Sequence, residues 1–145
     1  MNQDNINSPA QEPSSQTASV NDKQKILLVE DDPFLVKMYV EKFKNEGFDV
    51  ITSDNGIDGL KLALDEKIEA IILDLMIPKL SGIEFMKRLN ADEKGKTIPV
   101  IVLTNISDKE EQFQAKNLGA KDYLLKANLT PKQVVEKIKY FLSTS

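Results

Sequence analysis

The sequence predicts an α/β protein, a five-stranded parallel sheet with helices on both faces. The first observation is that five short apolar segments alternate with five segments of helical periodicity between residue 25 and the end of the chain. The second is that the central segments are apolar throughout, which is typical of strands buried on both faces of a parallel sheet. The third is that helix caps and turn residues separate the segments. We therefore expect right-handed crossover connections between neighbouring parallel strands.

The first strand is predicted at residues 26–29, an Ile-Leu-Leu-Val run. Asp32 is a suitable N-cap for the helix that follows, and Pro33 fits its first position, where a missing N–H is tolerated. Gly47 is a good residue to end this helix, because glycine adopts a positive φ without strain. The second strand is predicted at residues 48–53.

The second helix begins at Asn55, and the third strand is predicted at residues 69–75. An ionised Asp at the end of such an apolar strand needs a partner that offsets its desolvation. Pro78 then interrupts the chain before the third helix. Ser81 and Glu84 form the pattern of a capping box, which places the start of that helix.

The fourth strand is predicted at residues 98–104, with a proline near its start. Ser107 and Glu110 repeat the capping-box pattern and predict the start of the fourth helix, which we expect to end at Gly119. The fifth strand is predicted at residues 122–125.

The last helix begins at residues 130–133, where a Thr cap is followed by Pro and by Gln three residues on. We expect one folded domain over residues 24–145. Residues 1–23 are rich in Asn, Gln, Ser and Pro and lack the apolar content of a core, so we expect a disordered tail. The tail could be a tether or an inert extension, and the sequence leaves both open.

Composition excludes several kinds of site. The chain has 145 residues, no cysteine and no histidine, so it offers neither thiolate nor imidazole for metal binding or catalysis. Its formal net charge of −4 argues against direct binding to nucleic acid or to an anionic membrane surface. It has no apolar segment long enough to span a membrane and no signal-peptide pattern, so we expect a cytoplasmic protein without membrane insertion.

Polar side chains end four of the five predicted strands. They are Glu30, Asp31 and Asp32 after the first strand, Asp74 on the third, Thr104 on the fourth and Lys126 after the fifth. The carboxyl ends of parallel strands lie on one edge of the sheet, where ligands bind in open α/β folds. Several carboxylates in one crevice repel each other unless a cation neutralises them, and oxygen ligands favour Mg²⁺ or a similar hard cation. A carboxylate that is surrounded by a bound metal ion, an ammonium group and a hydroxyl group indicates a phosphoryl-transfer site.

The ordered set of motifs resembles the receiver domain of response regulators in two-component signalling, over residues 25–142. The motifs are Val29-Glu30-Asp31-Asp32, Leu73-Asp74-Leu75-Met76-Ile77-Pro78 with Gly82, Leu103-Thr104-Asn105, and Asp122-Tyr123-Leu124-Leu125-Lys126. The resemblance implies a stand-alone, flavodoxin-like receiver domain with strand order 2-1-3-4-5. It also implies a Mg²⁺-dependent (or Mn²⁺-dependent) switch in a phosphorelay that is not a turnover enzyme.

The resemblance also implies roles for individual residues. Asp74 would be the phosphoacceptor, and Asp31, Glu30, Asp74 and the Met76 backbone carbonyl would hold the metal. Thr104 and Lys126 would bind the phosphoryl group, and Thr104 with Tyr123 would form the switch. The phosphodonor would be a sensor histidine kinase or a phosphotransfer protein. The target, an unknown protein, would bind the face made by the fourth helix, fifth strand and fifth helix. The same face would make any weak dimer of an otherwise monomeric protein.

Two positions depart from the family's usual pattern, and two variable positions that flank the site are apolar. Glu30 stands where an Asp is common. Ala127 stands where a proline commonly follows the lysine in a cis peptide, so the geometry of that peptide is left open. Met76 and Ile106 are apolar residues beside the site, and we expect them to position hydrolytic water poorly, which predicts a long-lived phosphoryl group.

Two other functions are compatible with parts of the pattern. A binding module would keep the fold and leave the pocket unused, but it would not require the complete set of polar residues. A phosphatase with an Asp nucleophile would need a second acid two residues after Asp74, where the chain has Met76. Each polar residue taken singly also has a structural explanation, such as a turn cap at Asp74 or a surface lysine at Lys126. The sequence favours the phosphoryl-accepting switch because all of them occur together.

Overall fold

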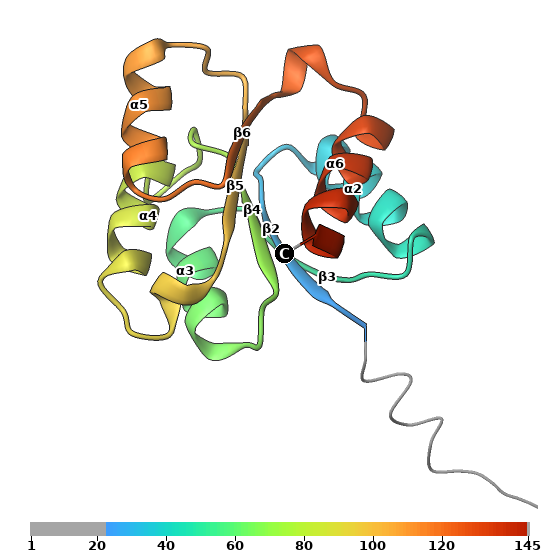
Figure 1. Ribbon diagram of the computed structural model, residues 1–145, viewed down its shortest axis with the longest axis horizontal. Coiled ribbons are helices and arrows are strands. Elements are labelled where there is room, and N and C mark those ends of the chain that lie inside the picture. Colours follow the sequence, from blue (N-terminus) through green and yellow to red (C-terminus); the bar gives the residue numbers. More distant parts are fainter. Residues whose placement is uncertain (1–22, 145) are drawn as a thin grey trace, which may run out of the picture.

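Five parallel strands form a single sheet in the order β3-β2-β4-β5-β6 (Figure 1). The structure is a computed structural model, and it describes residues 23–144. The strands are β2 (Lys25–Val29), β3 (Asp49–Ser53), β4 (Ala70–Leu73), β5 (Val100–Thr104) and β6 (Asp122–Leu125). This order confirms the predicted fold class and the predicted 2-1-3-4-5 arrangement. The tail expected at residues 1–23 lies, apart from Lys23, outside the described residues.

Within residues 23–144, five α-helices cover the two faces of the sheet. They are α2 (Pro33–Asn45), α3 (Gly56–Asp65), α4 (Gly82–Asn90), α5 (Lys109–Asn117) and α6 (Pro131–Thr144). Helices α3, α4 and α5 lie on one face and α2 and α6 on the other (Figure 1). The described part of the chain also has two short 3₁₀ turns, η2 (Gly95–Thr97) and η3 (Lys126–Asn128), which were not predicted from the sequence. Three strands are shorter than predicted, and the chain leaves the β4 ladder before Asp74.

The helix starts follow the predicted caps with one exception. The Asp32 carboxylate accepts hydrogen bonds from two amides of α2, and Thr130 exchanges hydrogen bonds with Gln133 at the start of α6. The prediction for α5 is wrong by one residue, because Asp108 rather than Ser107 accepts the bond from the third helical amide. Both residues have a Glu three positions later. The Asp carboxylate also adds a negative charge at the helix N-terminus, which favours it as the cap.

Two apolar cores lie on either side of the sheet. One packs side chains of α3, α4 and α5 against β2, β4 and β5, with Phe85 fully buried at its centre. The other packs α2 and α6 against the opposite face around Phe43. Alternate residues of the central strands enter the two cores, which explains why these strands are apolar throughout.

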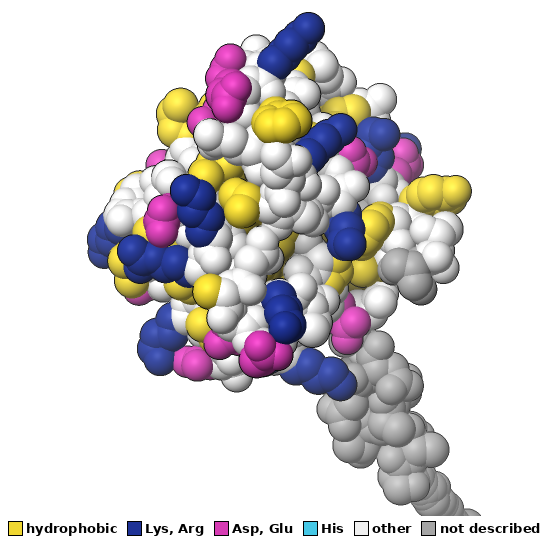
Figure 2. Space-filling view, turned by 60° about the vertical axis from the view of Figure 1, so that its left-hand side comes forward, with side chains coloured by type: hydrophobic (Ala, Val, Ile, Leu, Met, Phe, Trp, Pro, Cys, Tyr) yellow, Lys and Arg dark blue, Asp and Glu magenta, His cyan; other side chains and the backbone are white. Residues whose placement is uncertain are grey.

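The surface carries charges of both signs. On the face shown in Figure 2, Lys and Arg side chains are interspersed with Asp and Glu, and single apolar side chains lie between them. Helix surfaces add ion pairs one turn apart, such as Lys61 with Asp65 and Arg88 with Glu84. Pairs this exposed contribute little to stability, so the fold depends on its two cores.

Two phenylalanines test this conclusion. Phe85 is fully buried on α4, whereas Phe113 on α5 is 63% exposed. We expect Phe85→Ala to lower the free energy of unfolding by about 3–5 kcal/mol, because it leaves a cavity in the core. Phe113→Ala is expected to change it by about 0.5 kcal/mol or less. Urea unfolding measures both values, and equal losses would contradict this assignment of the core.

Candidate functional site

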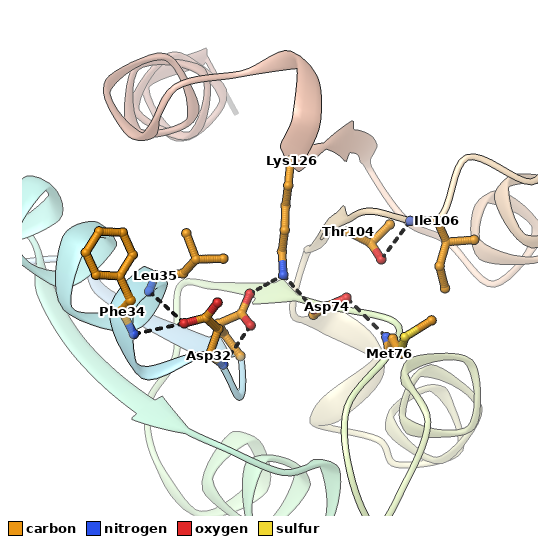
Figure 3. A network of polar contacts seen from close by, with 9 residues as sticks. Asp32, Phe34, Leu35, Asp74, Met76, Thr104, Ile106 and Lys126 are labelled. Carbon is orange, nitrogen blue, oxygen red and sulfur yellow. Dashed lines mark hydrogen bonds and ion pairs between the residues drawn. The ribbon is translucent and has the colours of Figure 1, made fainter.

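The predicted polar residues meet at the carboxyl edge of the sheet. Glu30 follows β2, Asp74 follows β4 and Thr104 ends β5, and all three are at least nine-tenths buried. Lys126 begins η3 directly after β6 and extends over the edge toward Asp74 (Figure 3). Strands β2, β4, β5 and β6 are consecutive neighbours in the sheet. The strand order therefore gathers residues that are far apart in the sequence.

The Lys126 ammonium bridges two buried carboxylates. Its Nζ lies 2.7 Å from Asp74 Oδ2 and 2.5 Å from Glu30 Oε1. The remaining carboxylate oxygens accept backbone hydrogen bonds. Met76 N–H donates to Asp74 Oδ1 at 3.1 Å, and Asp32 N–H donates to Glu30 Oε2 at 3.0 Å. One buried cation and two backbone amides thus offset the desolvation of two carboxylates.

Burial and ion pairing shift the pKa values of Glu30 and Lys126. Burial raises the pKa of Glu30 above its ordinary value, and the hydrogen bond from Lys126 only partly opposes this rise. Burial alone would lower the pKa of Lys126, but its hydrogen bonds to Asp74 and Glu30 outweigh burial and the pKa is raised. The ammonium therefore stays protonated at neutral pH and provides a permanent positive charge in the site.

Thr104 is connected to Tyr123 through one residue of the β5–α5 loop. Ile106 N–H donates to Thr104 Oγ1 at 3.3 Å (Figure 3), and the Tyr123 hydroxyl donates to the Ile106 carbonyl at 2.7 Å. Burial raises the pKa of the Tyr123 hydroxyl, so it stays a neutral donor. The Tyr123 side chain is half-buried and packs on the core of the α3–α5 face.

A cleft of about 480 Å³ opens beside these residues. Its lining is Glu30, Asp31, Asp32, Leu35, Asp74, Met76, Thr104, Asn105, Ile106 and Lys126. Carboxylate oxygens of Glu30, Asp31 and Asp74 lie within 4.8 Å of one another, close enough to share a cation. A donor set made only of oxygens fits a hard cation such as Mg²⁺.

Most of the predicted site residues line this cleft, whereas Tyr123 lies outside its lining and is linked to Thr104 through Ile106. Asp31 lies at the exposed side of the cleft, and Asp32 is mainly the cap of α2. The Met76 side chain is 69% exposed, at the opening of the cleft. The peptide bonds of residues 23–144 are all trans, including the one between Lys126 and Ala127 that the sequence left open. Sequence reasoning missed Asn105 as a lining residue, although its position directly after Thr104 was a usable signal.

A parallel sheet with this strand order and an acid–lysine–hydroxyl cleft at its carboxyl edge defines a receiver domain. The family model of the response regulator receiver domain matches residues 26–139, and the chain belongs to this family. Receiver domains accept a phosphoryl group from histidine kinases or phosphotransfer proteins, act as switches, and bind Mg²⁺ in an acidic pocket.

Particular relatives show how far the similarity extends. The chain is 35% identical over 122 residues to the alkaline phosphatase synthesis transcriptional regulatory protein PhoP of Bacillus subtilis, covering 84% of this chain and 50% of PhoP. It is 32% identical over 102 residues to the protein PilH of Pseudomonas aeruginosa, covering 70% of this chain and 84% of PilH.

A solved structure shows the same fold with the metal bound. It is the receiver domain of a sensor histidine kinase of Pseudomonas aeruginosa, with a magnesium ion coordinated in the active site cleft. Its TM-score is 0.74 at 26% identity, and the alignment covers 83% of this chain and 98% of that domain. The chain spans about half the length of PhoP but most of PilH. Within residues 23–144, no helix is both long and apolar enough to cross a membrane.

Magnesium is expected to stabilise the fold through Asp31. At a Mg²⁺ concentration ten times the dissociation constant, binding to the folded state alone should add about 1.4 kcal/mol to the free energy of unfolding. Asp31→Asn should abolish this increment, because a neutral amide is a poor ligand for a hard cation. Asp32→Asn is the matched control, since Asn caps a helix as well as Asp does. Equal Mg²⁺ responses of the two variants in urea unfolding would contradict the assignment.

Proposed function

We propose that this protein is a single-domain response regulator that is phosphorylated on Asp74 and signals to a separate target protein. The observation that carries the proposal is the placement of Asp74. Its buried carboxylate faces the cleft between an acidic pair, a protonated lysine and a threonine hydroxyl. The extent of the match to PilH supports the single-domain form.

Asp74 is the nucleophile in this proposal. One Asp74 oxygen forms a bond to phosphorus while the bond between phosphorus and an imidazole nitrogen of the donor's phosphohistidine breaks. The imidazole keeps the electron pair and takes up a proton. Because this chain has no histidine, the phosphohistidine must come from a partner. Transfer of this kind needs positioning and neutralisation of charge more than covalent assistance.

The other residues position and neutralise the phosphoryl group. Glu30, Asp31, Asp74 and the Met76 carbonyl would hold Mg²⁺ (or Mn²⁺), which neutralises negative charge on the phosphoryl oxygens when bound. Lys126 would pair with a phosphoryl oxygen in place of its present contact to Asp74. The Thr104 hydroxyl would donate to a second oxygen, which shifts its contact to Ile106 and through Ile106 affects Tyr123.

The signal would leave through the face formed by α5, β6 and α6. Tyr123 belongs to β6, and a groove of about 600 Å³ lies on this face between β6 and α6. Its apolar lining includes Leu129, Phe141 and the exposed Tyr140. A target protein, or a second copy in a weak dimer, would bind here. The protein would act in the cytoplasm as a switch that modifies only itself, without turnover of a metabolite and without binding nucleic acid directly.

Phosphorylation by a small phosphodonor tests the proposal. We expect the protein in Mg²⁺ and acetyl phosphate to gain the mass of one phosphoryl group, and Asp74→Asn to gain none. Intact-mass spectrometry follows both. A parent protein without adduct would favour a binding module, and continuous release of phosphate from varied monoesters would favour a phosphatase.

The phosphoryl group on Asp74 is expected to be long-lived. Met76 and Ile106 lie beside the acceptor, and neither side chain has a strong hydrogen-bonding group that could orient a water molecule. Met76→Asn supplies an amide at that place and should shorten the half-life, measured by loss of the adduct mass after removal of the donor. Phe34→Asn is the control, because Phe34 is equally exposed but lies outside the cleft lining. A parent half-life of seconds in Mg²⁺ buffer would contradict the prediction.

A further inference from the structure

The loop between β4 and α4 is held against the start of α3 by one carbonyl. The Pro78 carbonyl accepts a hydrogen bond from Gly56 N–H at 3.1 Å and another from Leu80 N–H at 2.8 Å. The second bond closes a γ-turn at Lys79, whose φ of 71° is unusual for a residue with a side chain. A strained conformation of this kind persists only where the surrounding structure enforces it.

At Gly56, α3 and this loop are so close together that a side chain would not fit between them. A Cβ on Gly56 would overlap the Leu80 carbonyl oxygen and would lie 2.7 Å from Leu80 Cβ. The nearest of these atoms belongs to the backbone, so a rotamer change cannot relieve the clash. Any side chain at residue 56 must therefore move the loop away from α3 or break the bond to Pro78.

The other end of the loop is fixed in the same way. Gly82 N–H donates to the Leu75 carbonyl at 2.9 Å, and a Cβ on Gly82 would lie 2.6 Å from Leu75 Cα. Met76 lies between these two fixed points, and its own N–H is bonded to the carboxylate of Asp74. The conformation of the Met76 backbone is therefore determined by contacts on both sides of it.

We propose that Gly56 is a positioning residue for the metal site, which acts by keeping the Pro78 turn closed so that the Met76 carbonyl is held ready to bind the cation. The inference rests on the proposed function, because it assumes that Mg²⁺ uses this carbonyl. It extends that function to a residue on α3, a helix that contributes no side chain to the cleft lining. Residues that orient a ligand without touching the metal commonly change affinity by about 10–100-fold when replaced.

Magnesium titration of the unphosphorylated full chain tests the proposal. We expect Gly56→Ala to weaken Mg²⁺ binding about tenfold in isothermal titration calorimetry. Gly59→Ala is the matched control, because it is the same change one turn later in α3. Its Cβ would contact the Val29 and Phe85 side chains rather than the loop. The control should lose stability and keep its Mg²⁺ affinity.

The outcomes separate this inference from the proposed function. If the parent protein does not bind Mg²⁺, the proposed function fails. If it binds Mg²⁺ and Gly56→Ala binds equally well, or loses affinity only as much as Gly59→Ala, Gly56 has a structural role alone and the inference is overturned.

Hydrogen exchange in the parent protein gives a second test that does not depend on the variant folding. If closure of the turn favours metal binding, then metal binding must favour closure by the same factor. We expect Mg²⁺ to slow exchange of the Gly56 amide more than that of the Gly59 amide, which is bonded to the Asn55 carbonyl within its own helix. Equal slowing of the two amides would also overturn the inference.

Discussion

The bridge from Lys126 to two buried carboxylates is the interaction on which the site depends. Two carboxylates this close together and this far from water repel each other, and desolvation opposes their charge. The ammonium relieves both costs, and the backbone amides of Asp32 and Met76 satisfy the remaining oxygens. Without the lysine, burial and the charge of Asp74 would raise the pKa of Glu30 further. The lysine thus provides a positive charge beside the acceptor carboxylate.

The fold and the residues of the candidate site could be predicted from the sequence, because both are indicated by patterns within short segments. Apolar strands, caps and acids at strand ends are features of a few consecutive residues, and a parallel sheet brings its carboxyl ends to one edge. The start of α5 could not be settled in this way, because Ser107 and Asp108 both satisfy the same pattern. Only the charge and geometry at the helix end distinguish them.

Contacts between distant segments were harder to predict. Nothing near Gly56 in the sequence points to Pro78, because their contact depends on how a loop after β4 packs on a helix that follows β3. The peptide after Lys126 was left open because the family commonly has a cis proline there; with Ala127 a cis bond would cost about 3–4 kcal/mol, and the peptide is trans. A sequence pattern indicates the conformation that a segment favours by itself, whereas the contact between Gly56 and Pro78 depends on segments that are distant in the sequence.

Ile106 makes its hydrogen bonds to Thr104 and Tyr123 through its backbone, with its N–H toward one and its carbonyl toward the other. Its side chain meanwhile lines the cleft beside the acceptor. The two properties are therefore separable by mutation. A change of side chain at this position can alter how quickly the proposed signal decays, while the backbone bonds that would transmit it stay in place. Related proteins could in this way adjust the duration of a response through single substitutions, without changing the hydrogen bonds that link Thr104 to Tyr123.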